Sequence, residues 1–169
     1  MMTIREERFD DAAAIRRVIL EAFGGPAEAE LVDKLRTNGK FALSLVAELD
    51  GQVVGHILFT VVTIEDADPC SRALGLAPLA VLIQFQRKGV GSELMHRSLE
   101  RCRDLGHDAI VVVGHPDYYP KFGFVPASRY GLRCEYDVLE DAFMALELRA
   151  GGLQGREGLV RYQPEFGDA

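Results

Sequence analysis

A run of polar, basic and glycine residues near the middle of the chain, QRKGVGS, has the residue types that bind an anion. The apolar pattern after it predicts a helix beginning near Val90, so the run is a strand-to-helix loop. Free N–H groups and the helix dipole attract negative charge at such a helix start. Gly89 and Gly91 let the backbone approach a ligand and adopt positive φ, and Arg87 and Lys88 add charge. For an isolated glycine pair, a tight strand-to-helix connection without a ligand is the simpler interpretation.

Two common phosphate-binding motifs can be tested against this loop. The P-loop pattern G-x-x-x-x-G-K-[ST] does not occur in the chain. The dinucleotide pattern G-x-G-x-x-G needs a glycine at position 94, where this chain has Leu94. A nucleotide-binding protein of either type is therefore disfavoured.

The elements that must position the loop follow from hydrophobic periodicity and turn residues. We expect strands at 3–8, 41–49, 52–64, 73–83 and 108–114, and helices at 9–23, 26–37 and 90–105. Segments 131–136 and 141–148 are predicted to form a late hairpin, and the tail to hold a last short strand. This order predicts an α/β (α+β) fold with a mixed central sheet flanked by helices.

Composition limits the class of protein. The chain has 169 residues, 48% hydrophobic residues and a net charge of −7, which predict one globular domain over 1–169 and argue against a nucleic-acid partner. No apolar run reaches the roughly 20 residues of a membrane span, and the N-terminus lacks an apolar signal core, so we expect a cytoplasmic protein. Cys70, Cys102 and Cys134 fit reduced thiols better than a disulfide framework or a metal site.

Two blocks of sequence together resemble a known family. Leu79-Ala80-Val81 followed by Q-R-K-G-V-G is similar to the acetyl-CoA motif Q/R-x-x-G-x-G/A of the GNAT acetyltransferase superfamily. Tyr119 begins the segment YPKFGF, which is similar to that family's Y-x-x-x-G-F element. The resemblance spans about residues 3–148, leaving 149–169 as a C-terminal extension expected to pack on the core. The segment GHPDYYPKFGFVPA resembles in particular a bacterial subgroup of N-acetyltransferases.

This resemblance implies a ligand for the loop, the pyrophosphate of acetyl-CoA, and no metal. It also implies a mostly antiparallel sheet that splays between the strands around 79–83 and 109–113, where the pantetheine arm pairs with exposed backbone. Pro78 is consistent with a break in the strand ladder there. The implied cofactor-binding residues are Leu79, Ala80, Val81, Gln86, Arg87, Lys88, Gly89, Val90, Gly91 and Ser92.

The implied reaction is direct transfer of the acetyl group to a primary amine. Tyr119 matches the family's general-acid tyrosine, and a phenol can protonate a departing thiolate. A packing tyrosine is the alternative for Tyr119, and Tyr118 is the neighbouring fallback. His115 is the candidate general base, although a polar turn residue explains it too. His56, interpreted more simply as a hydrogen-bonded strand histidine, and a chain of waters are further options for the base.

The acceptor and the oligomeric state are not specified by the sequence. The acceptor could be a small-molecule amine or a protein amine, and the acidic balance favours a cationic one. Glu65 and Asp66 could attract such a cation, although a solvated loop explains both. An acyl-CoA-binding sensor without catalysis is the alternative function. Residues after Gly151 could form a homodimer contact.

Overall fold

The computed structural model describes residues 1–65 and 72–168. Its helices and strands are β1 (Met2–Glu6), α1 (Ala12–Phe23), α2 (Ala27–Thr37), β2 (Phe41–Leu49), β3 (Gln52–Ile64), β4 (Ala73–Val81), α3 (Val90–Asp104), β5 (Ala109–Val113), β6 (Val125–Pro126), β7 (Leu132–Cys134), β8 (Phe143–Glu147) and β9 (Gly158–Arg161). Short 3-10 helices are η1 (Phe9–Asp11), η2 (Ile83–Phe85), η3 (Tyr119–Phe122), η4 (Ala127–Tyr130), η5 (Glu140–Ala142) and η6 (Pro164–Asp168).

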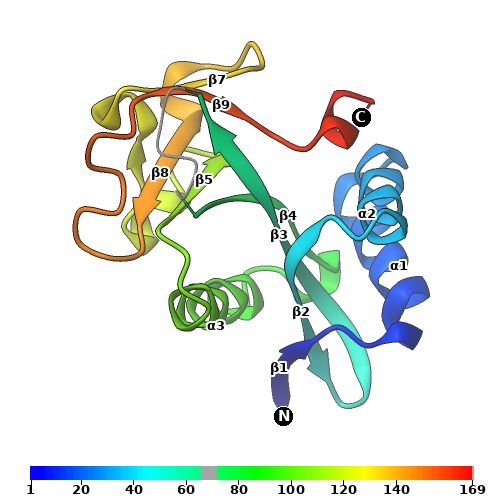
Figure 1. Ribbon diagram of the computed structural model, residues 1–169. Helices are drawn as coiled ribbons and strands as arrows, with labels where there is room; N and C mark the ends of the chain where they lie inside the picture. Colours follow the sequence, from blue (N-terminus) through cyan, green and yellow to red (C-terminus); the bar gives the residue numbers. More distant parts are fainter. Residues whose placement is uncertain (66–71, 169) are drawn as a thin grey trace. The chain divides into compact units, whose positions relative to one another are not determined.

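The strands form a mixed, mostly antiparallel sheet in the order β1-β2-β3-β4-β5-β8-β6, with β9 paired to β3 and β7 (Figure 1). This confirms the predicted fold class. The chain separates into two compact units. The first comprises Met1–Phe59, Ala77–Ser98 and the C-terminal residues from Pro164; the second comprises Thr60–Leu76 and Leu99–Gln163.

In the first unit, neighbouring residues of β3 face different helices because successive side chains of a strand point to opposite faces. A Cβ atom at Gly55 would lie 3.0 Å from both Leu94 and Val90, so the start of α3 packs directly on this glycine. His56, the next residue, faces the network that includes Arg36 of α2. Gly55 therefore lets α3 approach the strand closely.

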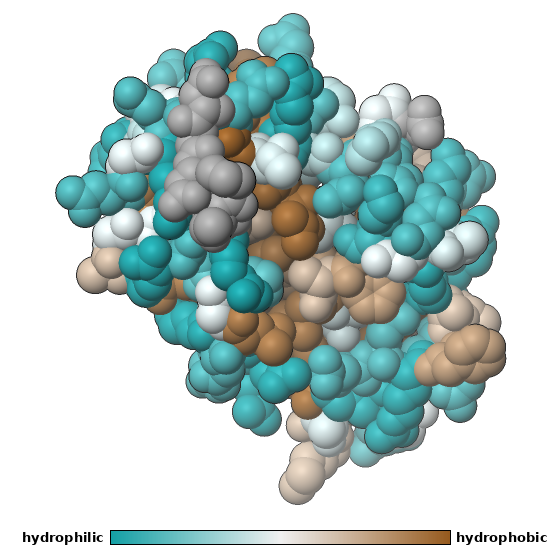
Figure 2. All heavy atoms as spheres, viewed as in Figure 1, coloured by the Kyte–Doolittle hydropathy of each residue, from teal (hydrophilic) through white to brown (hydrophobic). Residues whose placement is uncertain are grey.

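Helices α1 and α2 bury one face each, as their periodicity predicts. The buried residues are Ile15, Val18 and Ile19 in α1, and Ala29, Leu31, Val32 and Leu35 in α2. Gly24 ends α1 in the left-handed conformation, with its N–H bonded to the carbonyl of Leu20 at 2.9 Å. The surface over α2 in Figure 2 is mostly hydrophilic, as expected for the outer face of an amphipathic helix.

Helix α3 carries the predicted apolar stripe of Val90, Leu94, Met95, Leu99 and Cys102, all buried. Leu105 was expected to continue this stripe. It lies beyond the end of the helix and is 41% exposed. Among the described residues, no helix combines the length and the apolarity needed to cross a membrane.

The second unit places β8 between β5 and β6, and this arrangement overturns the predicted late hairpin. β8 pairs antiparallel with β5 through all five of its residues, and with β6 through Val125 and Pro126. Both edges of β8 are therefore occupied. β7 pairs instead with β9, in parallel, and β9 joins β3. A hairpin was expected because β7 and β8 are close in the sequence. Residues 135–142 connect them without a tight turn, so β7 is free to pair with β9, which lies farther along the chain.

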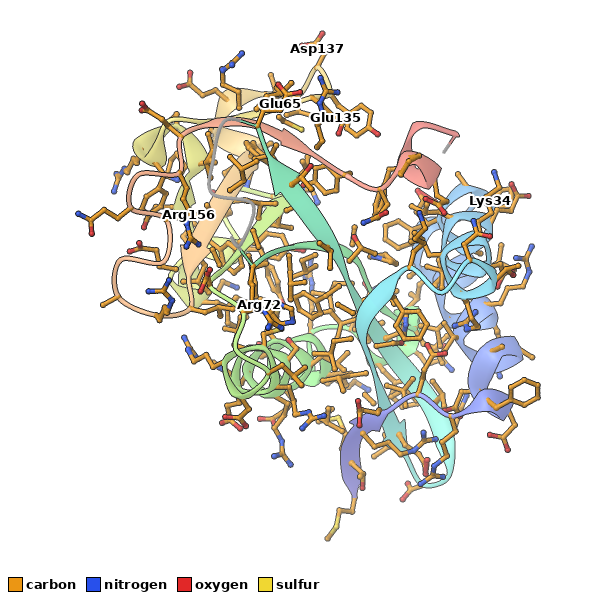
Figure 3. The ribbon with its side chains drawn as sticks, viewed as in Figure 1. Lys34, Glu65, Arg72, Glu135, Asp137 and Arg156 are labelled. Carbon is orange, nitrogen blue, oxygen red and sulfur yellow. The ribbon has the colours of Figure 1, made fainter. Side chains whose placement is uncertain are left out.

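The carboxylate of Asp108 helps to anchor the segment that follows β8. Asp108 accepts hydrogen bonds from Arg149 at 2.7 Å and Arg156 at 2.5 Å, and from the backbone N–H of Arg72 at 3.1 Å. Figure 3 labels Arg72 and Arg156. Burial favours the neutral acid, but the bonds from these arginines hold the pKa of Asp108 at about 2. The carboxylate is thus ionised and fixes the tail beside the start of β5.

Candidate active site

The end of β4 and the loop after it form one connected piece of structure in the first unit. The ladder between β4 and β5 pairs Ala73–Leu76 with Ala109–Val112, so Leu79–Val81 lie beyond its last pair. The side-chain amide of Gln86 donates to the carbonyl of Val81 at 3.0 Å. This bond brings the two predicted cofactor-binding segments, 79–81 and 86–92, together.

The loop itself contains two residues with left-handed backbone. Gly89 has φ 87°, and a Cβ atom there would meet no other atom within 4 Å, so glycine is required by conformation and not by space. Arg87 has φ 61° although it is not a glycine, a conformation that costs roughly 1–2 kcal/mol. Strain of this kind is concentrated at functional sites.

Gly91 differs from the prediction that both glycines adopt positive φ. It is the second residue of α3, and its backbone is helical. The reason is that the left-handed turn is completed at Gly89, whose carbonyl accepts the N–H of Glu93 at 3.0 Å. The first N–H groups of a helix have no intrahelical acceptor, so those of Val90, Gly91 and Ser92 are available to a ligand.

Charge around the loop is positive and open to solvent. Arg87 and Lys88 are both exposed, and neither makes an ion pair with any residue in 1–65 or 72–168. Val90 anchors the helix start, since only 4% of it is exposed. The arrangement of helix N–H groups, helix dipole and two exposed cations can hold an anionic group.

Tyr119 lies in the second unit at the start of η3. Only 8% of it is exposed, and its ring makes edge-to-face contacts with Tyr118 at 5.1 Å and Phe124 at 5.6 Å between centroids. Burial, with a smaller effect of Tyr118, raises its pKa to about 12. The phenol is therefore neutral, with its proton in place, throughout the physiological range.

Gly114 makes room for this ring, and sequence reasoning did not single it out. A Cβ atom at Gly114 would lie 2.3 Å from Cε2 of Tyr119, so the ring lies directly over the glycine backbone. The only sequence signal was a glycine at the end of the apolar strand segment AIVVVG. No larger residue fits at this position without displacing Tyr119.

His115 and Tyr119 meet in one tight turn. The carbonyl of His115 accepts the N–H of Tyr118 at 3.1 Å and that of Tyr119 at 3.5 Å. The His115 side chain is exposed. The structure therefore brings both predicted catalytic residues into one turn of the second unit, whereas the predicted cofactor loop, residues 86–92, belongs to the first unit.

His56 is completely buried in a polar network of the first unit. Its Nε2 atom lies 2.9 Å from the Ser44 hydroxyl, which also donates to Glu7. Arg36 donates to both oxygens of Glu7, at 2.9 and 3.1 Å. Sequence reasoning identified His56 alone, because its partners come from three other segments and no local pattern connects them.

Burial determines the charge of His56. Desolvation, assisted by Arg36 and opposed by Glu7, lowers its pKa to about 4. The imidazole is therefore neutral near pH 7, and its buried Nδ1 atom has no hydrogen-bond partner among residues 1–65 and 72–168. The structure thus agrees with the interpretation of His56 as a hydrogen-bonded histidine of a strand.

The remaining candidates show no further site. Glu65 pairs with Arg161 at the surface, and Asp66 and Cys70 lie outside the described residues. Cys102 and Cys134 are free thiols, and burial raises the pKa of both. Across residues 1–65 and 72–168, no group of three or more His, Cys, Asp or Glu side chains is placed to hold a metal.

Comparisons with known proteins agree with this geometry. The sequence profile of the acetyltransferase (GNAT) family matches residues 12–124. The uncharacterized N-acetyltransferase YhbS of Escherichia coli K12 is 37% identical over 166 residues, which cover 98% of each chain. The uncharacterized N-acetyltransferase YjhQ of the same strain is 40% identical over 134 residues, 78% of this chain and 74% of that protein.

Two solved structures are similar over almost the whole chain. The crystal structure of YhbS from Escherichia coli in complex with CoA has a TM-score of 0.94 at 36% identity, covering 98% of this chain and 92% of that one. A GNAT family acetyltransferase from Brucella melitensis in complex with acetyl-CoA has a TM-score of 0.81 at 36% identity, covering 98% of both chains.

Proposed function

Because this chain belongs to the acetyltransferase (GNAT) family of acetyl-CoA-dependent N-acetyltransferases, we propose that it transfers the acetyl group of acetyl-CoA directly to a primary amine. The observation that carries this proposal is the strained turn at Arg87 and Gly89, which opens the N-terminus of α3. Binding of CoA and acetyl-CoA by the two similar proteins supports the same cosubstrate here.

The cofactor's pyrophosphate binds the backbone N–H groups of residues 88–92, with Arg87 and Lys88 adding charge. Oriented N–H groups and a helix dipole favour such an anion. The pantetheine amides pair with the backbone of Leu79–Val81, since this part of β4 lies beyond the ladder with β5. Pro78 has no N–H to contribute there. No metal is needed for these contacts.

The chemistry is attack of a neutral amine on the thioester carbonyl. A C–N bond forms, the C–S bond breaks, the amine loses a proton and the CoA sulfur gains one. Tyr119 serves as the general acid that protonates this sulfur. Its pKa of about 12 exceeds the roughly 8.5 of a free thiol, so the proton moves only as negative charge builds on the sulfur. Until then the phenol donates a hydrogen bond.

His115 is the proposed base that receives the amine's proton, directly or through water. Imidazole is the side chain best suited to exchange protons near neutral pH. Its exposed side chain and its place in the Tyr119 turn support this assignment. His56 is a poor base in comparison, because its imidazole is completely buried.

We further propose that residues 1–169 act as one acetyltransferase domain in the cytoplasm, with a core at about 3–148. Contacts of the tail support a packed extension at 149–169: β9 pairs with β3, and Asn38 donates to Glu165 at 2.7 Å. The partners are acetyl-CoA and a small-molecule or protein amine, with no nucleic acid or membrane. The residues after Gly151 are the proposed homodimer contact.

A screen of amine acceptors with release of the CoA thiol as readout tests the proposed function. CoA binding is measured separately by calorimetry on the same protein. Transfer to at least one amine, above the rate of acetyl-CoA hydrolysis, is the expected result. CoA binding without transfer to any amine would leave only the acyl-CoA-binding role.

A further inference from the structure

A pocket in the second unit lies outside the loop and the turn described above. Its volume is about 250 Å³. The lining residues come from η4, β7, the segment after β7, η5 and β8: Ser128, Leu132, Arg133, Cys134, Tyr136, Asp137, Val138, Glu140 and Phe143. We call it the β7–β8 pocket. Drug-sized ligands typically occupy roughly 300–1,000 Å³, so this pocket fits a smaller molecule.

The floor of the pocket is the surface of the unit's hydrophobic core. Leu132 and Phe143 are 3% and 4% exposed and belong to that core, and Cys134 and Val138 pack against it. Tyr136 adds an aromatic face at the opening, where it is 37% exposed and tilted against Tyr162 with 6.1 Å between centroids. A ligand bound here therefore needs an apolar body.

The rim of the pocket carries charged side chains of both signs. Asp137 and Glu140 are exposed acids, and Arg133 is an exposed base. Across residues 1–65 and 72–168, none of the three makes an ion pair. Figure 3 shows Asp137 on the loop that follows β7. The rim thus has a net charge of −1 and an aromatic ring, which suit a cation.

The pocket lies next to the turn that holds Tyr119. Its wall residue Phe143 pairs with Val113 at the end of β5. The following residue, Gly114, donates its N–H to the carbonyl of Ala142 at 2.9 Å, and the ring of Tyr119 covers Gly114. The start of β8 is therefore shared by the pocket and by the candidate catalytic turn.

The pocket also lies outside the part of the chain that the family profile matches. That match ends at residue 124, whereas the lining residues run from 128 to 143. The motif residues of the cofactor loop and Tyr119 all fall inside the match. A feature that selects this protein's own acceptor is expected outside the shared motifs.

We infer that the β7–β8 pocket binds the acceptor, and that the acceptor is a small cationic amine with an apolar body. This inference rests on the proposed function. Asp137 and Glu140 attract the ammonium form, Tyr136 covers it, and the core surface receives the apolar body. The amine reacts after it loses a proton near the Tyr119 turn. Arg133 disfavours cations and limits how strongly a simple amine binds.

The test uses 2-phenylethylamine with the full-length protein, measuring its Kd by calorimetry and its KM from thiol release with acetyl-CoA. Loss of hydrogen bonds to charged groups predicts roughly a tenfold weaker interaction in the Asp137→Asn, Glu140→Gln double variant, with unchanged CoA affinity. Ser128→Trp fills the pocket from an exposed position and has the same effect. Asp141→Asn, an exposed neighbour that does not line the pocket, is the matched control and changes nothing.

Two further comparisons define the ligand class. Methylamine, which lacks an apolar body, binds more weakly than 2-phenylethylamine. Arg133→Ala strengthens 2-phenylethylamine binding by about twofold, because an exposed like charge is removed. Weaker binding in Arg133→Ala would overturn the inferred class, since it would mean that Arg133 supports the ligand.

Each contrary outcome has its own meaning. Acetyl transfer with an unchanged KM in both the double variant and Ser128→Trp overturns the pocket and leaves the transferase intact. No detectable binding of 2-phenylethylamine overturns it as well. Binding of both CoA and 2-phenylethylamine without transfer to any amine overturns the proposed function, and the acceptor role with it.

Discussion

The cofactor loop and the Tyr119 turn are built in opposite ways. The loop relies on backbone: a left-handed Arg87, a left-handed Gly89 and the open N-terminus of α3, all near solvent. The Tyr119 turn relies on one side chain that is packed against aromatic rings and over Gly114. Main-chain N–H groups can bind phosphate whatever their side chains are, whereas the acidity of a phenol depends on its surroundings.

The largest expected effect tests the side-chain half of this comparison. Tyr119→Phe keeps the packed ring and removes only the hydroxyl, so the fold and CoA affinity should change little. General acid catalysis contributes roughly 10²–10⁴-fold, and turnover with a confirmed acceptor should fall by about that factor. Tyr118→Phe is the matched control. Full activity in Tyr119→Phe would rule out the general-acid role.

A second effect concerns burial in the first unit. His56 has its pKa lowered to about 4 from 6.5, so the unfolded state binds its proton more readily than the folded state. The contribution of neutral His56 to the free energy of unfolding is fully present above about pH 6.5. It is lost as the pH falls toward 4. By linkage this amounts to about 3 kcal/mol of unfolding free energy.

The pH dependence is measured by denaturant unfolding between pH 7 and pH 4, on wild type and on His56→Gln. The wild type should lose more stability across this range than the variant. Glu7, whose pKa is lowered by Arg36 and Ser44 against the effect of burial, adds its own loss below about 4.5, and both proteins share it. If the free energies of unfolding of the wild type and of His56→Gln fall in parallel from pH 6.5 to 5, burial does not lower the pKa of His56 as assigned.

A substitution at Gly91 tests whether the loop binds the cofactor through its backbone. Its helical backbone accepts a side chain without strain, so Gly91→Val should fold normally and act only by crowding the ligand. Loss of charge-assisted hydrogen bonds to phosphate predicts roughly 10–100-fold weaker CoA binding by calorimetry. Gly91→Ala is the milder control. Unchanged affinity in a folded Gly91→Val protein means that the helix start does not contact the cofactor.

The smallest expected effect concerns the side-chain charges of the loop, as distinct from its backbone N–H groups. Exposed charges contribute roughly 0.2–1 kcal/mol each, so the Arg87→Ala, Lys88→Ala double variant should bind CoA about 2–30-fold more weakly. Wild-type affinity should fall with added salt, and less so in the variant. Arg97→Ala, exposed on α3, is the control. Equal binding of CoA, dephospho-CoA and pantetheine would remove the phosphate site altogether.

Local patterns predicted most elements within a few residues. Strands β2 and β3 occupy the expected ranges, because a β-branched apolar run bounded by turn residues leaves few alternatives. Asp50 and Gly51 adopt the positive φ that a two-residue hairpin needs. The late hairpin was wrong, because the pairing of a short strand depends on which sheet edge is free, and local sequence does not report this.

The sequence by itself determined the order of elements, the helix that starts at Val90 and the glycine turn before it, since periodicity and backbone freedom are local properties. Tertiary structure decided the rest. It placed Gly114 under Tyr119, surrounded His56 with Glu7, Ser44 and Arg36, and folded residues 128–143 around the β7–β8 pocket. The physical reason is that burial and charge neighbours act through space, so they depend on how the chain folds and not on the pattern of the local sequence.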